Sequence, residues 1–110
     1  MVINLGTNDW AGGASEDEFI AGVVEFIKVV RKHNPNAKII WAYGLMVKHY
    51  TEFLKKAVEE AQADDDKVYF VPMTIQNAED GTGPQGHPSV KTHEKAGAEF
   101  AAVLKDIMGW

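Results

Sequence analysis

Hydrophobic residues in this chain follow two spacings that alternate along its length. Three short, nearly continuous runs at positions 2–5, 38–43 and 67–72 are rich in Val, Ile, Trp, Tyr or Phe and are bounded by Gly, Asn, Asp or Pro, as is typical of buried strands. Each run is followed by a segment in which hydrophobic residues recur every three or four positions, as on one face of a helix. This repeated order predicts an α/β fold, a parallel sheet with helices on both faces and right-handed crossovers.

The helical segments have recognisable starts. The first begins at Ser15, which can form a capping box with Glu18, and the third begins near Ser89. The second covers about residues 48–63, with Glu52 and Lys56 placed one turn apart to pair on its outer face. The residues that we expect these helices to bury are Phe19, Val23, Phe26, Ile27 and Val30 in the first, Tyr50, Phe53, Leu54, Ala57, Val58 and Ala61 in the second, and Val90, His93, Gly97, Phe100, Leu104 and Ile107 in the third.

Composition narrows the functional classes. A length of 110 residues fits one domain or part of one. The absence of cysteine excludes disulfides, thiolate zinc sites and a cysteine nucleophile. A net charge of −5 argues against nucleic acid or an anionic membrane as the main partner. No histidines have zinc-ligand spacing, the acidic run 64–66 is expected to be a solvated turn, and the glycine-rich stretch 81–86 has no lysine to hold a phosphate, so we expect no metal and no cofactor.

Candidate chemistry gathers where the predicted strands end, because parallel sheets place active sites outside the carboxyl ends of their strands. Gly6-Thr7-Asn8-Asp9-Trp10 follows the first strand. Gly6 would let the backbone approach a ligand, the Asn8 amide could donate to a developing oxyanion, and Trp10 could stack on a sugar ring. The competing interpretation is that Asn8 or Asp9 only caps a turn or helix.

A second candidate, His87, follows the glycine-rich loop and directly precedes the third helix. This position puts it on the same rim as Asn8, and an imidazole changes charge near neutral pH, which suits a general base. A surface histidine without a role is the competing interpretation. His33 and His49 lie beside helix ends and are expected to be solvated.

The two rim segments together resemble a known family. Residues 2–9, Val-Ile-Asn-Leu-Gly-Thr-Asn-Asp, resemble the third conserved block, Gly-x-Asn-Asp, of the SGNH (GDSL-type) hydrolases. Residues 86–93, which begin Gly-His-Pro-Ser, resemble the fifth block, which carries the catalytic histidine, and the two intervening strand–helix units match the family's spacing. Residues 34–39 and 68–72 further resemble the family 2 carbohydrate esterases, which include acetyl xylan esterases, so the resemblance covers nearly the whole chain.

The resemblance implies a flavodoxin-like three-layer α/β/α fold and an esterase acting on acetylated carbohydrate, in an extracellular location. A serine would attack the ester, His87 would carry its proton, and Asn8 with Gly6 would stabilise the oxyanion. Most of the family has an aspartate three residues before the histidine, where this chain has Pro84. The resemblance to family 2 carbohydrate esterases implies another solution, because these enzymes often orient the histidine with a backbone carbonyl. We expect the loop around Gln85 and Gly86 to supply such a carbonyl.

The family's nucleophile belongs to a Gly-Asp-Ser block that has no counterpart here, because Ser15 and Ser89 are both expected to be helix caps. The sequence therefore looks like the C-terminal part of an SGNH hydrolase domain, residues 1–110 with three strand–helix units, lacking the N-terminal nucleophile-bearing part and inactive alone. The strand from Val2 to Leu5 would have an exposed edge, covered by that N-terminal part or by a second copy. The alternative is a non-catalytic α/β binding or interaction module. A nucleotide-binding or receiver-like domain is disfavoured, because Asn8, Asp9 and Trp10 provide neither an acidic cluster nor a phosphate loop.

Overall fold

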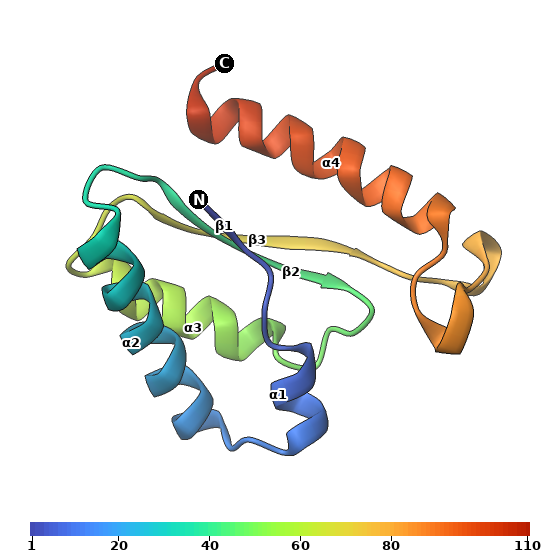
Figure 1. The fold of residues 1–110 in the computed structure, drawn as a ribbon, viewed down its shortest axis with the longest axis horizontal. Helices are drawn as coiled ribbons and strands as arrows, with labels where there is room; N and C mark the ends of the chain where they lie inside the picture. The colour runs from blue at the N-terminus through green and yellow to red at the C-terminus, as the bar shows by residue number, and fades with distance from the viewer.

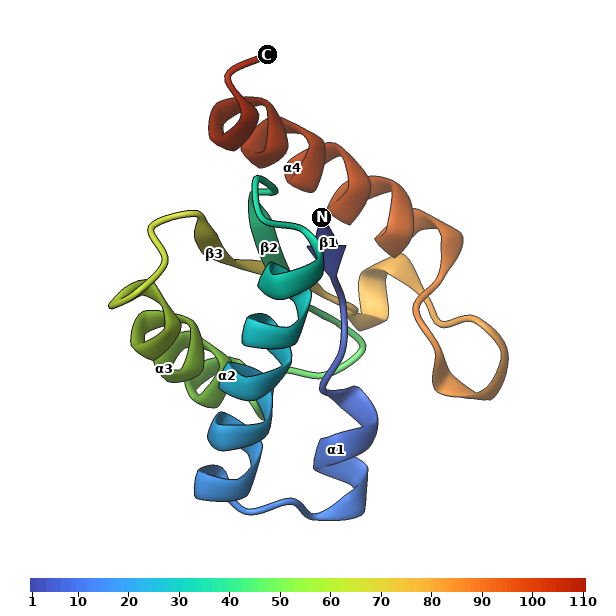
Figure 2. The same ribbon diagram turned by 60° about the vertical axis from the view of Figure 1, so that its left-hand side comes forward.

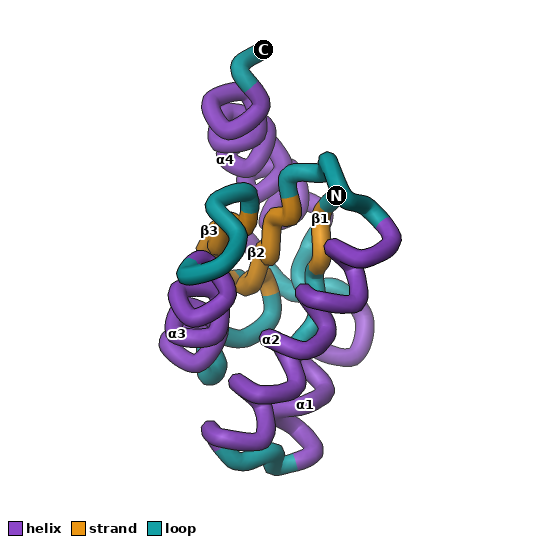
Figure 3. The backbone as a smooth tube through the Cα atoms, turned by 90° about the vertical axis from the view of Figure 1, so that its left-hand side faces the viewer, coloured by secondary structure: helices purple, strands orange, loops and turns teal.

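A sheet of three parallel strands lies at the centre of the computed structural model, which describes residues 1–110. The strands are β1 (Val2–Ile3), β2 (Ile39–Leu45) and β3 (Val68–Ile75), and β2 is the middle one. Helices α2 (Glu16–His33) and α3 (Thr51–Gln62) lie on one face, and α4 (Val90–Met108) lies on the other (Figure 1). Figure 2 and Figure 3 show the sheet between these two helical layers. The predicted α/β architecture is confirmed.

The strand ends differ from the predicted ones for local reasons. β1 ends at Ile3, two residues early, because Asn4 replaces backbone pairing with its side chain, whose Nδ2 donates to the carbonyl oxygen of Ala42 at 2.8 Å. β2 continues to Leu45, two residues further than predicted, through a register irregularity at Gly44 and Leu45, where φ is 146° and 66°. Pairing resumes beyond this irregularity, between Leu45 and Ile75, so both strands continue past their predicted ends.

β3 also extends beyond its predicted end, to Ile75, and it contains Pro72. A proline cannot donate to a neighbouring strand, and it is therefore confined to edge strands. β3 is such an edge, because β2 is its only neighbour in the sheet.

Helix α2 begins as predicted. The Ser15 hydroxyl accepts from the Glu18 backbone N–H at 3.4 Å, and the Glu18 carboxylate accepts from the Ser15 N–H at 3.3 Å, which completes the capping box. Phe19, Val23, Ile27 and Val30 are buried against the sheet and α3, as expected. Phe26 was expected to be buried as well, and that prediction is wrong. Its ring is edge-on to Trp41 and 41% exposed, because no part of the chain covers that side of α2.

Helix α3 begins at Thr51, three residues later than predicted, because residues 48–50 form a turn. Lys56 forms an ion pair with Glu16 of α2 instead of Glu52. After the helix, Asp65 is not a solvated turn residue. The guanidinium of Arg31 donates to both of its carboxylate oxygens, at 2.6 and 3.1 Å, and lowers its pKa.

Helix α4 has its predicted cap, since Ser89 Oγ accepts from the Thr92 N–H at 3.2 Å, but its buried face is rotated by about one position. Thr92 and Ala96 are buried in its first half, whereas Val90, His93 and Gly97 are exposed. The prediction of a core histidine at position 93 is therefore wrong. Ion pairs from Lys91 and Lys95 to Asp80 fix which face of the helix meets the preceding loop, and they turn His93 outward. None of the helices has the length and apolar content needed to cross a membrane.

Candidate active site

The segment after β1 forms a short helix, α1 (Thr7–Gly12), that the sequence analysis did not predict. Gly6 stands at its N-cap position with φ of 122°, and a Cβ there would lie 3.2 Å from the Tyr43 ring and 3.3 Å from the Phe19 ring. Only glycine fits this turn without strain. Because Gly6 occupies the N-cap position and no side chain caps α1, the interpretation of Asn8 as a helix cap is wrong. Asn8 is exposed, with its carboxamide available to a ligand.

Trp10, on the same helix, lies parallel to the ring of His49, with ring centroids 4.1 Å apart and an interplanar angle of 6°. His49 is exposed, as expected, but it covers one face of the indole, and Trp10 remains 40% exposed. Side chains two positions apart on a helix diverge by about 200°. Asn8 and Trp10 therefore project from different sides of α1, so any sugar ring on Trp10 lies away from the group that Asn8 contacts.

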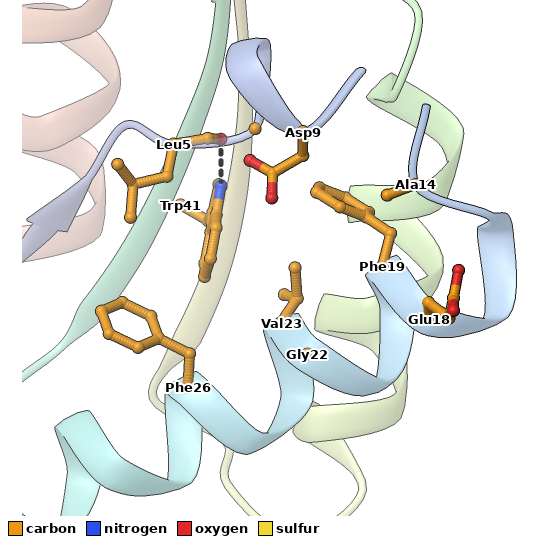
Figure 4. Close-up of a pocket in the computed structure, with 10 residues that line it drawn as sticks. Leu5, Asp9, Ala14, Glu18, Phe19, Gly22, Val23, Phe26 and Trp41 are labelled. Carbon is orange, nitrogen blue, oxygen red and sulfur yellow. Dashed lines mark hydrogen bonds between the residues drawn. The ribbon is translucent and has the colours of Figure 1, made fainter. Parts of the chain in front are cut away.

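An apolar cavity of about 280 Å³ lies beside this segment, between α1, α2 and β2 (Figure 4). The rings of Phe19, Phe26 and Trp41 border it, and Asp9 lies at its rim. Trp41 Nε1 donates to the carbonyl oxygen of Leu5 at 3.1 Å, which fixes one wall. Gly6 lines this cavity but neither Asn8 nor His87 does, so the cavity meets the candidate site only at Gly6.

His87 closes a tight turn that begins at Pro84. The Pro84 carbonyl oxygen accepts from the His87 backbone N–H at 3.2 Å and lies 3.1 Å from the ring Nδ1. A carbonyl can only accept, so this contact requires the proton of the neutral ring to be on Nδ1. Nε2 then carries a free lone pair, and the side chain is exposed. The backbone carbonyl expected from the loop around Gln85 and Gly86 is present, and Pro84 supplies it.

Asp80 does not orient the histidine. Its buried carboxylate accepts from Lys95 Nζ at 2.6 and 2.7 Å and from Asn77 Nδ2 at 3.0 Å, and it lies 3.0 Å from Lys91 Nζ. The hydrogen bonds from these lysines lower the pKa of Asp80 from 3.8 to about 2. The aspartate therefore fastens the loop after β3 to α4, and the hydrogen-bond partner of the His87 ring is the Pro84 backbone carbonyl instead.

One residue that contacts the histidine turn was missed in the sequence. Gln76 directly follows β3, and its side-chain Nε2 donates to the carbonyl oxygens of Gly86 at 3.1 Å and Met46 at 3.4 Å. Its position in the sequence could have indicated this contact, because a polar residue directly after a buried parallel strand lies at the edge of the sheet where active sites form.

The structure thus places a carboxamide after β1 and an oriented imidazole after β3, at the carboxyl ends of the strands that flank β2 (Figure 1). Their approach to a single carbonyl stays a prediction. Both serines are engaged as helix caps, Ser15 at α2 and Ser89 at α4. No group of three or more His, Cys, Asp or Glu side chains is close enough to hold a metal ion. The arrangement can supply a base and an oxyanion donor.

The parallel sheet, the Asn8 segment and the His87 turn are the features on which the resemblance to the SGNH class of α/β hydrolases rests. No family model matches the chain. A family two carbohydrate esterase from Clostridium thermocellum, solved in complex with cellohexaose, superposes with a TM-score of 0.92 and 32% identity over 99% of this chain and 36% of its own. An acetyl xylan esterase, Est2A, from the rumen bacterium Butyrivibrio proteoclasticus superposes with a TM-score of 0.90 and 26% sequence identity, over 99% of this chain and 37% of its own.

In sequence, the chain is 32% identical over 119 residues to the cellulase/esterase CelE of Acetivibrio thermocellus, a match that covers all of this chain and 14% of that protein. The chain therefore spans about a seventh of the curated relative and just over a third of the solved structures that it matches. Along its whole length the chain is similar to part of these carbohydrate esterases, and the predicted resemblance to the family 2 enzymes is confirmed.

Proposed function

We propose that this chain supplies the general base and an oxyanion donor to an SGNH esterase that hydrolyses O-acetyl esters of carbohydrate. The observation that carries this proposal is the 3.1 Å contact between His87 Nδ1 and the Pro84 carbonyl. It leaves Nε2 free to accept a proton, which is the state that a general base must have before the reaction.

In the proposed reaction, His87 Nε2 removes the proton of a serine hydroxyl as its oxygen bonds to the acetyl carbon. Asn8 and the backbone of Gly6 donate to the carbonyl oxygen, which becomes negatively charged. The bond to the sugar oxygen then breaks, and His87 returns the proton to that oxygen. Water, activated by the same imidazole, releases acetate from the serine. The serine belongs to the N-terminal part of the domain, so the chain alone is expected to be inactive.

The names of the relatives support an acetylated polysaccharide as the substrate. One solved relative is an acetyl xylan esterase, and another binds cellohexaose. In this chain, the face of Trp10 that His49 leaves open could stack on a sugar ring remote from the acetyl group. An extracellular location fits such a substrate and stays part of the proposal.

A second candidate, a non-catalytic binding or interaction module, is favoured by the engagement of both serines as caps. The two candidates predict different behaviour when a nucleophile is supplied. The solved Clostridium thermocellum esterase is a suitable host, because its matching segment superposes on this chain with a TM-score of 0.92.

The test is a chimaera in which this chain replaces the matching segment of that esterase. Acetate release from acetylated xylan is measured. Because a general base and an oxyanion donor act in the transition state, we expect His87→Ala to lower kcat/KM by about 10³-fold and Asn8→Ala by about 10²-fold.

His33→Ala is the matched control, because His33 is exposed at the C-terminal end of α2 and belongs to neither candidate segment. This variant is expected to keep the parent rate. Unchanged kcat/KM in the His87→Ala chimaera would reject the esterase role. The 110-residue chain and its His87→Ala variant should both hydrolyse p-nitrophenyl acetate at background rates.

A further inference from the structure

We propose that Gln76 is a positioning residue for His87, an inference that rests on the proposed role of His87 as the base. The Gln76 side chain contacts two carbonyl oxygens, those of Gly86 and Met46, at 3.1 and 3.4 Å. Because both partners accept, the NH₂ group of the amide must face them. The other end of the amide, Oε1, is then buried without a partner. An unpaired buried oxygen is unfavourable, and here it accompanies two hydrogen bonds from the NH₂ group, which points to a specific function of that group.

The bond to Gly86 acts directly on the histidine. The Gly86 carbonyl and the His87 N–H belong to the same planar peptide group. Gln76 holds its oxygen, and Pro84 accepts from its N–H at 3.2 Å. With both ends held, the peptide plane cannot rotate. The position of the His87 Cα is fixed with it, and at the observed φ of −73° the side chain points so that Nδ1 lies beside the Pro84 carbonyl.

The turn requires such an external hold, because its backbone is strained. Gln85 has φ of 56° and ψ of 29°, a left-handed conformation that residues with a Cβ avoid. Gly86 follows with φ of 76°, so two successive residues are left-handed. Relaxation of Gln85 to a negative φ would redirect the turn and carry the histidine away.

Gln76 is well placed to prevent this movement. Its own backbone N–H donates to the Leu45 carbonyl at 2.7 Å, which ties it to the end of β2. Its side chain also donates to the carbonyl oxygen of Met46, so the position of the histidine turn is set by the central strand and the loop that follows it. The Gln76 carboxamide thus links the position of His87 to the sheet.

The test is NMR of the 110-residue chain with ¹⁵N-labelled histidine. Gln76→Met has a similar length and volume but no donor. We expect the His87 ring shifts to report the Nδ1–H tautomer in the wild type and a mixture of tautomers in Gln76→Met, with faster exchange of the His87 amide. Gln76→Glu, which turns a carboxylate toward two carbonyls, should lose the Nδ1–H preference at least as far.

Val58→Ala controls for a general loss of stability, because Val58 is buried in α3 and does not contact the histidine turn. It should leave the His87 ring shifts unchanged. Gln76→Asn, which keeps the donor on a shorter side chain, should be intermediate, and it serves as a second variant if Gln76→Met folds poorly. Wild-type ring shifts in Gln76→Met would overturn the proposal and leave Gln76 as a space filler. These spectra contain no ester, so they are independent of the chimaera test of His87 as a base.

Discussion

Gly44 lies at the bulge of β2, where the backbone of β3 passes closest. A Cβ at this position would be 2.4 Å from the Met73 carbonyl oxygen, and the backbone has φ of 146°. Both the contact and the conformation exclude a side chain. Gly97 is the opposite case, because it lies within α4 and a Cβ there would meet nothing within 4 Å.

Gly44→Ala should lower the free energy of unfolding by about 3 kcal/mol, because the methyl group forces β2 away from β3 at a strained φ. Gly97→Ala should raise it by about 1 kcal/mol, because alanine favours a helix interior. Urea denaturation of the two variants measures both effects. If the two changes had the same sign, the bulge geometry would be incorrect.

At the scale of elements, the connection from β3 to α4 is held by charge more than by apolar contact. The carboxylate of Asp80 is fully buried, and Lys91 and Lys95 lie next to it from the first turns of α4. Ser89 adds a hydrogen bond from its hydroxyl to the Asp80 carbonyl at 2.7 Å. Because His87 belongs to this connection, its position depends on Asp80 remaining ionised.

The lowered pKa of Asp80 gives a pH dependence with a definite sign. A carboxyl with pKa of about 2 in the folded chain and 3.8 in the unfolded chain stabilises the fold at every pH above 3.8. That contribution is lost as the pH falls from about 3.8 to about 2. The difference in free energy of unfolding between the wild type and Asp80→Asn should therefore be constant from pH 5 upward, roughly, and shrink below pH 4, roughly.

Denaturation curves at several pH values test this prediction. Asp66→Asn is a suitable control, because Asp66 is exposed in the turn after α3. A stability difference between the wild type and Asp80→Asn that persists unchanged at pH 2 would show that the ion pairs are not what holds this connection.

The whole molecule is a flat body of 41 × 38 × 20 Å with a radius of gyration of 14.5 Å, whereas a compact chain of this length has about 13 Å. Exposed apolar side chains lie on the β1 side, where Leu5 is 55% and Phe26 of α2 is 41% exposed, and both line the cavity of Figure 4. The opposite edge, β3, carries Pro72, which discourages pairing. The β1 edge is therefore the one that we propose is covered, by the N-terminal part of the domain or by a second copy.

When nothing else covers that edge, the chain should associate with itself through β1. Val2 is half exposed on β1, and Val2→Lys should shift the chain toward monomer because a charged edge resists pairing. Val90→Lys is the control, since Val90 is 75% exposed on α4. Light scattering after size-exclusion chromatography gives the masses. A wild-type monomer at high concentration, or equal association of both variants, would contradict the proposal.

Local signals in the sequence were sufficient where they act between near neighbours. The capping box of Ser15 and Glu18, the cap at Ser89 and the alternation of the three strands with the three long helices are contained in short stretches and were predicted, whereas the six-residue helix α1 was not. The candidate chemistry of Asn8 and His87 was also readable, because parallel sheets place the ends of their strands at one edge. Hydrophobic spacing and turn chemistry thus determine the fold class and the residue types of the site.

The tertiary structure decided what depends on residues far apart in the chain. The outward position of His93 follows from the ion pairs of Lys91 and Lys95 with Asp80, which helical spacing does not contain. The His87 ring contacts a backbone carbonyl, which the identity of the side chains does not reveal. The bond from Gln76 to the turn that carries His87 links the ends of two strands. Such contacts depend on how elements are placed in space, and a one-dimensional pattern specifies that placement only through packing of the whole chain.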